Sequence, residues 1–503
     1  MKQAHSLQVV DIGIDTHQEP VVYLRRDCHI CRSEGLASNG RVTLRFEQTS
    51  IIATLNVVDE HVLVAGTAGL SKSALHRLGI REGAAIWVCH APDIAETLIN
   101  AAAGNKILSF TDGNASYNQI FMASDDIHKT AFNSFLSVCA GSRLDVDEII
   151  DLTQAMVACG KRLHWPNQSL ILDKHCVGGL PGNRTSPLVV SIVSAAGLMV
   201  PKTSSRAITS PSGTADTMAT LTTVNLDLTD IQRVVAETNA CLVWGGAVNL
   251  SPADDVLIRI ERALDLDGEG QLIASVLSKK IAAGSTHAVI DIPVGPTAKV
   301  RTKMDAERLA SIFTQVGAAC GIFIRCLISD GCQPVGLGIG PVEEARDVLA
   351  VLQGDVWAPK DLRERALMLA AHLFSLAYQF SYESGLEKAT VILDEGQAWR
   401  QFQRIVAAQG GLKTLPEARY QHCETLSCAG TLIAVDNRRL ARQAKLAGAP
   451  GTPAAGIRLH ARVGDVLRVG APVFTMYSGS RGELDYALSY YREHSPFTFV
   501  HDE

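Results

Sequence analysis

The chain has 503 residues, of which 47% are hydrophobic and 19% are charged, and its formal net charge is −6. A chain of this length is too long for one ordinary hydrophobic core, so we expect about three domains. The acidic balance argues against a nucleic-acid-binding protein, which usually carries a basic excess, but it is compatible with a local basic site for one phosphate.

The N-terminal segment and the cysteines indicate a cellular compartment. "MKQAHSLQVV" has no apolar core fit for a signal peptide, and the longest apolar stretch, residues 188–200, is too short to cross a membrane. We therefore expect a cytoplasmic protein whose 12 cysteines are reduced thiols. The one Cys-x-x-Cys motif, Cys28 to Cys31, has no second ligand pair at a suitable spacing, so we predict a turn there and no bound metal.

Residues 1–90 carry short β-branched segments separated by turn residues, which is typical of strands. The predicted strands are "VVYLRR", "RVTLRF", "SIIATLNVV", "HVLVAG" and "AAIWVCHA", and one short helix is predicted at "SKSALHRLG". We expect a small N-terminal β-rich domain, followed by a polar connection around "FTDGNAS".

Helical periodicity begins after residue 91. "DDIHKTAFNSFLSVCAG" and "DVDEIIDLTQAMVACGK" carry apolar residues at helical spacing. Asp147 and Glu148 fall in the first turn of the second helix, where the helix dipole favours carboxylates. We expect a helical domain over residues 91–165, to which a later segment near residues 240–285 also belongs.

Apolar strands and helices alternate from Ser169 onward. The strands are predicted at "SLILDKH", "THAVIDIPVG" and "FIRCLISD", and the helices at "TSPLVVSIVSAAG", "LIASVLSKKIAAG" and "DAERLASIFTQVGAACG". This alternation implies parallel strands with crossover helices, and ligands gather beyond the carboxyl ends of such strands. We expect an α/β domain over residues 166–415 that binds phosphate and substrate.

The C-terminal part returns to β structure after a long helix at "LRERALMLAAHLFSLAYQF". "HARVGDVLRVGAPVFTMY" alternates, with Gly464 and Gly470 at turns. It resembles the small barrel-sandwich modules that carry biotin or lipoyl groups but lacks their lysine-bearing turn, so we predict a structural β-rich domain over residues 416–503. The expected fold class is multidomain α/β, with a parallel or mixed sheet between two β-rich ends.

Two stretches have the composition of an anion site. "LDKHCVGGLPGNRTSPL" places Lys174 at a strand end, followed by glycines and a helix start near Thr185 or Ser186. Glycine-rich backbone and a helix N-terminus together bind oxyanions. "PKTSSRAITSPSGTADTMATL" is dense in hydroxyl groups, and Thr214 or Asp216 is expected to cap its helix. We expect the two stretches to form walls of one cleft.

"DKHCVGGLPGNRTS" and "TSSRAITSPSGTADTM" resemble the two signatures of the thymidine phosphorylase family. Nearly the whole chain is similar to the long members, which include AMP phosphorylases and "putative thymidine phosphorylases". The resemblance implies a pentosyltransferase in which phosphate attacks the anomeric carbon of a nucleoside or nucleotide and the base leaves, through an oxocarbenium-like state. It implies no metal and no organic cofactor, since phosphate is a co-substrate, and a homodimer or larger homo-oligomer.

The resemblance also assigns roles to single residues. It implies that phosphate is bound by Lys174, Ser186, Ser205 and Thr214. It implies that His175 and Asp267 are catalytic, His175 on the side of the base and Asp267 as proton donor to the leaving base. The implied substrate-binding residues are Gly179, Ser205, Arg206, Ala207, Ile208, Thr209, Ser210, Thr214, Ser275, Lys279 and Lys299. The chain departs from the family pattern at Cys176, where short members carry a serine that contacts phosphate, because a thiol is a weaker donor.

The nature of the base and the sugar stays open at this point. Ile260 occupies the position of an arginine that grips the base in pyrimidine-specific members, and an aliphatic side chain cannot replace that contact unless Arg259 or Arg262 does so through a shifted register. Asp267 and Lys299 match AMP phosphorylase residues, so we favour a nucleoside 5′-monophosphate such as AMP. The alternatives are a thymidine phosphorylase and a non-catalytic nucleotide-binding protein.

Each of these assignments also has a purely structural reading. Asp267 is then a turn residue in "LDLDGEG", Lys299 an ordinary solvated lysine, and His175 a hydrogen-bonding residue at a strand end.

Overall fold

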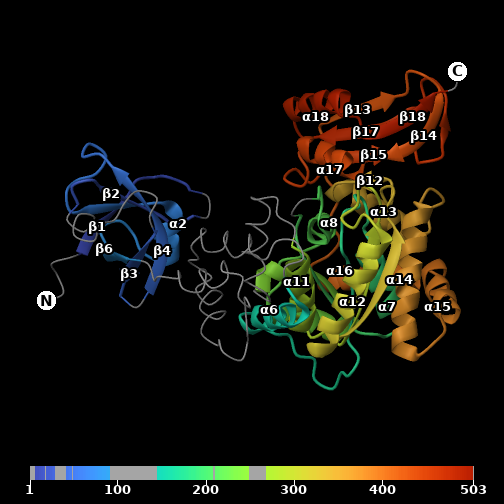
Figure 1. Ribbon diagram of the computed structural model, residues 1–503, viewed down its shortest axis with the longest axis horizontal. Helices are drawn as coiled ribbons and strands as arrows, with labels where there is room; N and C mark the ends of the chain where they lie inside the picture. The colour runs from blue at the N-terminus through green and yellow to red at the C-terminus, as the bar shows by residue number, and fades with distance from the viewer. Residues whose placement is uncertain are drawn as a thin grey trace. The chain divides into compact units, whose positions relative to one another are not determined.

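The computed structural model describes residues 6–16, 19–28, 41–47, 49–90, 144–207, 210–248 and 268–501 (Figure 1). The chain divides into two compact units, Met1–Arg143 and Leu144–Glu503. The first is a β-rich barrel and the second combines an α/β part with a C-terminal β-rich part, which confirms the predicted multidomain α/β fold class. The predicted domain boundaries stay predictions.

The described part of the first unit is a closed barrel with strand order β1-β5-β2-β4-β3-β6. Its interior is lined by fully buried aliphatic side chains such as Leu24, Leu44 and Leu55. A short helix, α2, begins after Ser71, whose hydroxyl accepts the amide of Ala74. The elements are β1 (Ser6–Asp11), β2 (Val21–Arg25), β3 (Arg41–Phe46), β4 (Thr49–Val58), β5 (Thr67–Leu70), α2 (Lys72–Leu78) and β6 (Ala85–His90).

Two strands of this barrel differ from the sequence prediction. β1 lies in a segment for which we predicted no strand. The predicted strand "HVLVAG" is wrong: residues 61–66 form turns, and β5 begins at Thr67. Val62 and Val64 are largely exposed, whereas Ala68 and Leu70 are fully buried. The strand therefore forms at the residues whose side chains enter the barrel core. The predicted polar connection and the predicted helix at "DDIHKTAFNSFLSVCAG" lie outside the described residues.

The α/β part of the second unit is built on parallel strands, as predicted. β7 (Leu172–Cys176), β10 (His287–Val294) and β11 (Phe323–Asp330) form a sheet with the order β11-β10-β7. β8 (Val200–Ser204) and β9 (Ala240–Trp244), which we did not predict, form a second parallel pair. An isolated parallel β-bridge between Ile171 and Met199 links this pair to the three-stranded sheet.

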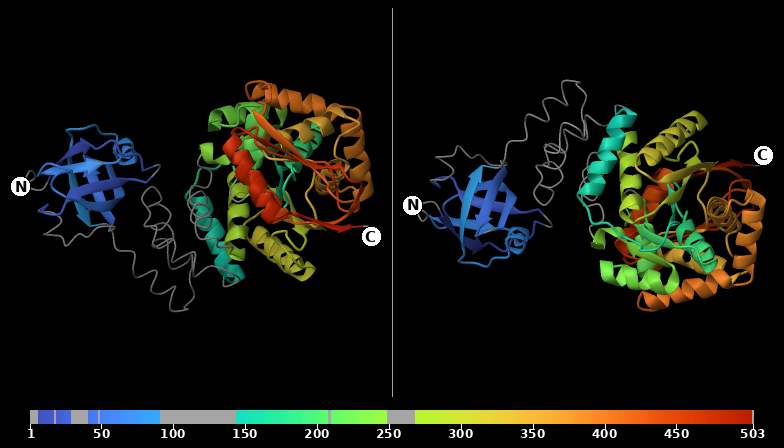
Figure 2. Two further views of the ribbon diagram at one scale, coloured as in Figure 1. Left: turned by 90° about the horizontal axis from the view of Figure 1, so that it is seen from above. Right: turned by 90° about the horizontal axis from the view of Figure 1, so that it is seen from below.

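Helices surround these strands. α7 is buried along nearly its whole length and packs against α14 and α16, which explains its continuous apolar sequence. α14 and α15 lie side by side (Figure 1), as do α6 and α11 (Figure 2). The helices are α6 (Val146–Ala158), α7 (Thr185–Ala195), α8 (Thr214–Leu221), α9 (Leu228–Thr238), α11 (Glu269–Ala282), α12 (Lys303–Ala319), α13 (Pro341–Gln353), α14 (Lys360–Tyr378), α15 (Tyr382–Asp394) and α16 (Gln397–Ala408), with the 3₁₀ turn η1 (Gly245–Val248).

The C-terminal part has two antiparallel sheets, with the orders β12-β15-β17-β13 and β16-β14-β18. β12 comes from the chain between β11 and α13, so the α/β part contributes a strand to this sheet. Gly464 and Gly470 adopt positive φ at the predicted turns. The elements are β12 (Gly338–Ile339), β13 (Tyr420–Thr425), β14 (Gly430–Val435), α17 (Asn437–Leu446), β15 (Gly456–Leu459), β16 (Val466–Leu467), β17 (Pro472–Ser478), α18 (Arg481–Glu493) and β18 (Phe497–His501).

Two features are absent from the described ranges. No helix there is long and apolar enough to span a membrane. No group of three or more His, Cys, Asp or Glu side chains within the same ranges is placed to hold a metal ion. Cys28 packs against the barrel core, while Cys31 lies outside the described residues, so the prediction for this motif stays a prediction.

Candidate active site

The glycine-rich loop after β7 is fixed by close backbone contacts. Gly179 has φ +89°, and a Cβ at this position would lie 2.3 Å from the backbone nitrogen of Lys299. Gly182 has φ +74°, and a Cβ there would lie 2.3 Å from the carbonyl oxygen of Val335. Only glycine fits both the backbone conformation and the space. The loop therefore brings Gly179 and Lys299, two predicted substrate-binding residues, into contact.

Lys174 holds a buried ammonium group at the start of α7. The residue is 2% exposed, and its Nζ donates to Oγ1 of Thr185 at 2.5 Å. Burial lowers the pKa of Lys174 from 10.5 to about 8, helped by the charges of Lys202 and Arg184. A cation at a helix N-terminus is unfavourable by itself, because that end of the helix carries positive partial charge. An anion bound between the two would stabilise both.

The N-terminus of α7 carries no capping side chain, because its N-cap residue, Arg184, makes no side-chain hydrogen bond to the first turn. The N-cap residue of α8 is Gly213, whose backbone amide donates to the carboxylate of Asp216. In α7 the hydroxyl of Ser186 is nearly buried and makes no hydrogen bond to any other described residue. Backbone amides of an uncapped first turn are ready donors to a phosphate oxygen.

Of the two residues predicted to cap α8, Asp216 does so from within the first turn, whereas Thr214 does not. The helix begins at Thr214, and the N-cap position belongs to Gly213. The carboxylate of Asp216 accepts the backbone amides of Gly213 at 2.9 Å and of Ala207 at 2.6 Å. Asp216 therefore joins the segment around Ala207 to the start of α8.

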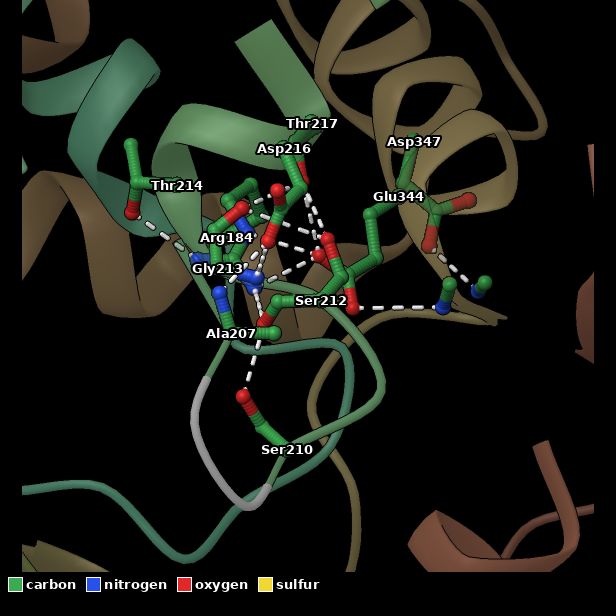
Figure 3. A network of polar contacts seen from close by, with 12 residues as sticks. Arg184, Ala207, Ser210, Ser212, Gly213, Thr214, Asp216, Thr217, Glu344 and Asp347 are labelled. Atoms are coloured by element: carbon green, nitrogen blue, oxygen red, sulfur yellow. Dashed lines mark hydrogen bonds and ion pairs between the residues drawn. The ribbon is translucent and has the colours of Figure 1, made fainter. Parts of the chain in front are cut away.

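Arg184 links the two helix starts (Figure 3). Its Nη1 donates to Oγ1 of Thr214 at 2.8 Å, and its Nη2 donates to the carbonyl oxygen of Ser212 at 2.9 Å. Its Nε donates to Oε2 of Glu344 on α13 at 2.7 Å. The guanidinium group thus holds Thr214, a predicted phosphate ligand, in place.

The second predicted stretch lies against the start of α8. The carbonyl of Ser205 accepts the amide of Ala215 at 3.3 Å, and a Cβ on Gly213 would lie 2.6 Å from that carbonyl oxygen. Arg206 pairs with Asp216 at 3.1 Å and lies 5.0 Å from the ring centroid of Trp244. The Ser210 hydroxyl donates to the carbonyl of Ser212 at 2.9 Å. Ile208 and Thr209 lie outside the described residues.

Beneath the glycine-rich loop, Asp173 binds two lysines. Its carboxylate, in a residue that is 1% exposed, accepts Lys202 Nζ at 3.0 Å and Lys280 Nζ at 2.7 Å. Burial opposes ionisation of Asp173, but the charges of Lys202 and Lys280 hold its pKa below the ordinary value. Burial also lowers the pKa of Lys280 to about 7.

His175 lies in a strongly cationic environment. Burial, followed by the charges of four lysines, holds the pKa of His175 well below its usual value of 6.5. These lysines are, in order of effect, Lys280, Lys202, Lys279 and Lys174. The imidazole is therefore neutral near pH 7, with one nitrogen that donates and one that accepts.

α11 carries Ser275 and Lys279 one turn apart, so both lie on one face of the helix. The charge of Lys279 contributes to the lowered pKa of His175, after those of Lys280 and Lys202. Asp267 and Ile260 lie outside the described residues, so their roles stay predictions.

Cys176 is held inside the loop. Its Sγ accepts Nδ2 of Asn183 at 3.3 Å, and burial raises the pKa of the thiol to about 12. It is a neutral thiol whose sulfur already accepts a hydrogen bond.

Sequence reasoning missed Glu344 and the bridging role of Arg184. The two residues are 160 positions apart, and no local motif signals their contact. A carboxylate pair at the start of a helix, Glu343 and Glu344, was the available signal, and it reads as an ordinary interaction with the helix dipole.

Comparisons with known proteins identify the relatives of this chain. The family described as "Glycosyl transferase family, a/b domain" matches residues 168–312. "Putative thymidine phosphorylase 2" of Acidovorax sp. (strain JS42) is 53% identical over 492 residues, which cover 97% of this chain and 95% of that protein. "Putative thymidine phosphorylase" of Legionella pneumophila (strain Paris) is 50% identical over 497 residues, which cover 97% and 94%.

Among solved structures, anthranilate phosphoribosyltransferase from Thermus thermophilus matches with a TM-score of 0.51 and 18% identity. The match covers 62% of this chain and 99% of that one, and it shows a shared fold.

Proposed function

Because the chain belongs to the thymidine and AMP phosphorylase family and is a pentosyltransferase, we propose that it catalyses reversible phosphorolysis of the N-glycosidic bond of a nucleoside 5′-monophosphate such as AMP. The products would be the free base and ribose 1,5-bisphosphate. The observation that carries the phosphate step is the buried ammonium of Lys174 at the uncapped start of α7.

The proposed reaction needs three things from the protein. Phosphate is held for attack by Lys174, Ser186, Ser205 and Thr214. An oxygen of phosphate forms a bond to the anomeric carbon as the bond from that carbon to the base nitrogen breaks. The electron pair stays on the base, which takes a proton from Asp267, while the neutral His175 serves as a hydrogen-bond partner on the base side.

The preference for a 5′-phosphate rests on positive charge beside the loop. The backbone and Cβ of Lys299 lie against Gly179, and the charge of Lys279 contributes to the lowered pKa of His175. A 5′-phosphate brings about two negative charges, which such cations would stabilise. A neutral nucleoside has no charged group for these two lysines to bind.

Thymidine is the second candidate substrate. Cleavage would then give thymine and 2-deoxyribose 1-phosphate, and the names of the relatives favour this reaction. The third possibility raised by the sequence, a non-catalytic nucleotide-binding protein, has no support from relatives that are all named as enzymes.

The test is release of free base from AMP, CMP, UMP, thymidine and uridine at fixed phosphate. The proposal expects a monophosphate to be cleaved with the highest kcat/KM. If thymidine is cleaved most efficiently and the monophosphates are inert, the nucleotide reaction is wrong and cleavage of thymidine replaces it as the function.

Two variants sharpen this test. Lys299→Ala should weaken nucleotide binding by about 1.5 to 3 kcal/mol, the value of a hydrogen bond to a charged group, and leave cleavage of unphosphorylated nucleosides nearly unchanged. Lys303→Ala is the matched control, because the Lys303 side chain is 79% exposed at the start of α12. Asp267→Asn should lower turnover more than binding, because it removes proton donation to the base.

A further inference from the structure

Glu344 is a buried carboxylate at the start of α13, far in sequence from the loops that it contacts. Its side chain is 1% exposed, and its Oε2 lies 2.6 Å from Nη2 of Arg184. The same oxygen accepts the hydroxyl of Thr217 on α8 at 3.0 Å, and Oε1 accepts the amide of Gly340 at 3.3 Å. A buried carboxylate is expensive unless it is paired in this way.

Arg184, the partner of Glu344, contacts the starts of both α7 and α8. Arg184 is the N-cap residue of α7, and its two terminal nitrogens hold Ser212 and Thr214 on either side of Gly213, the N-cap of α8 (Figure 3). One carboxylate on α13 therefore fixes the arginine that sets the spacing of the two helix starts. A guanidinium fork suits this task, because its donors have a rigid planar arrangement.

We propose that Glu344 is a positioning residue of the phosphate site, which acts through Arg184 to hold the N-termini of α7 and α8 at the separation that one phosphate needs. The inference rests on the proposed function in that phosphate is the anion bound there. Glu344 makes no contact with substrate in this scheme. Its effect is on affinity for phosphate, since displacement of the donors by about 1 Å is enough to weaken an oxyanion site.

The neighbouring residue supplies a matched control. Glu343 is equally buried, but its carboxylate pairs with Arg458 of the C-terminal part at 3.1 Å and with Arg346 at 3.2 Å. Glu343→Gln and Glu344→Gln therefore each neutralise one buried, arginine-paired carboxylate on the same helix turn. Only the second changes a contact to α7 and α8.

The experiment compares the wild-type protein, Glu344→Gln and Glu343→Gln. Calorimetry gives the Kd for inorganic phosphate, and base release gives KM for phosphate and for the organic substrate. Loss of a charged hydrogen bond predicts that Glu344→Gln raises the phosphate Kd and KM roughly tenfold to a hundredfold. The kcat at saturating phosphate and the KM of the organic substrate should change less than about threefold. Glu343→Gln should leave the phosphate Kd unchanged, whatever it does to Tm.

Equal phosphate Kd values for the two variants, or an unchanged value for Glu344→Gln, would overturn the proposal. If Glu344→Gln does not fold, Arg184→Lys takes its place: it keeps the charge but loses the fork, and it must raise the phosphate Kd over that of Glu343→Gln.

Failure of the proposed function looks different. A wild-type protein that binds phosphate but releases no base from any nucleoside or nucleotide lacks the proposed activity, while the phosphate Kd values still decide the role of Glu344. A wild-type protein that does not bind phosphate refutes the positioning role.

Discussion

Replacement of Lys174 by methionine should stabilise the fold while it removes phosphate binding. Burial is the main reason that the pKa of Lys174 falls from 10.5 to about 8. At roughly 1.4 kcal/mol for each pKa unit, the charged form costs the fold about 3 kcal/mol at neutral pH. Methionine fills a similar volume without charge, and loss of the hydrogen bond to Thr185 offsets about 1 kcal/mol of the gain. We expect the free energy of unfolding to rise by about 2 kcal/mol at pH 7.

The gain should depend on pH in one direction. Between pH 8 and pH 10.5 the unfolded chain keeps a proton on Lys174 that the folded chain has released, so the stability of the wild-type protein rises with pH across this window. The advantage of methionine is therefore complete below pH 8 and disappears toward pH 10.5.

Lys280→Met is the matched control for this prediction. Lys280 is equally buried, but its Nζ lies 2.7 Å from the carboxylate of Asp173. Removal of Lys280 leaves that buried carboxylate with Lys202 alone, which costs about 3 to 5 kcal/mol. This cost offsets most of the gain from removing an ammonium group whose pKa burial lowers to about 7, so Lys280→Met should stabilise the fold less than Lys174→Met does.

Urea unfolding followed by tryptophan fluorescence at pH 7 and pH 10 measures both variants, and calorimetry measures phosphate binding. The reasoning is refuted if Lys174→Met unfolds at lower urea than the wild-type protein at pH 7. It is also refuted if the difference in stability is the same at both pH values.

Three further predictions concern the ionisation of His175, the loop and the barrel. His175 should remain neutral at about pH 6 in an NMR titration, and Lys279→Met should raise its pKa because one of four repelling charges is removed. Gly179→Ala should weaken nucleotide binding and destabilise the fold by about 2 kcal/mol or more in urea unfolding, whereas Gly197→Ala, also at positive φ but with open space around it, should cost about 1 kcal/mol. A chain without residues 1–90 should keep base release but form a smaller assembly in light scattering, and an unchanged assembly would exclude a role of the barrel in oligomerisation.

The sequence predicts best those elements whose burial is uniform. β10 and α7 are buried on nearly every side, so a continuous apolar run identifies them without any knowledge of their neighbours. β8 was missed because "VPKTS" carries a lysine and a threonine that are buried only through partners elsewhere in the chain, as the contact of Lys202 with Asp173 shows.

The sequence predicts the proximity of site residues where they lie in one short stretch, and it does not predict contacts between distant segments. Lys174, Thr185 and the glycines lie in one short stretch, so their proximity follows from the strand, loop and helix that contain them. The contact between Arg184 and Glu344 depends on how α13 packs against α7 and α8, which no local pattern encodes. The sequence left the cap of α8 open between Thr214 and Asp216, because Asp216 reaches two amides from inside the helix and spacing alone does not reveal that geometry.

The pairing of β12 with β15 has a consequence for the order in which the protein is made. The ribosome synthesises Gly338–Ile339 long before Gly456–Leu459, so β12 has no β15 to pair with during that interval. The same segment packs against the glycine-rich loop, since a Cβ on Gly182 would meet the carbonyl oxygens of Val335 and Gly338. We therefore expect the anion site to mature only after Gly456–Leu459 has been synthesised, so that shorter nascent chains fold much of the α/β part and yet stay inactive.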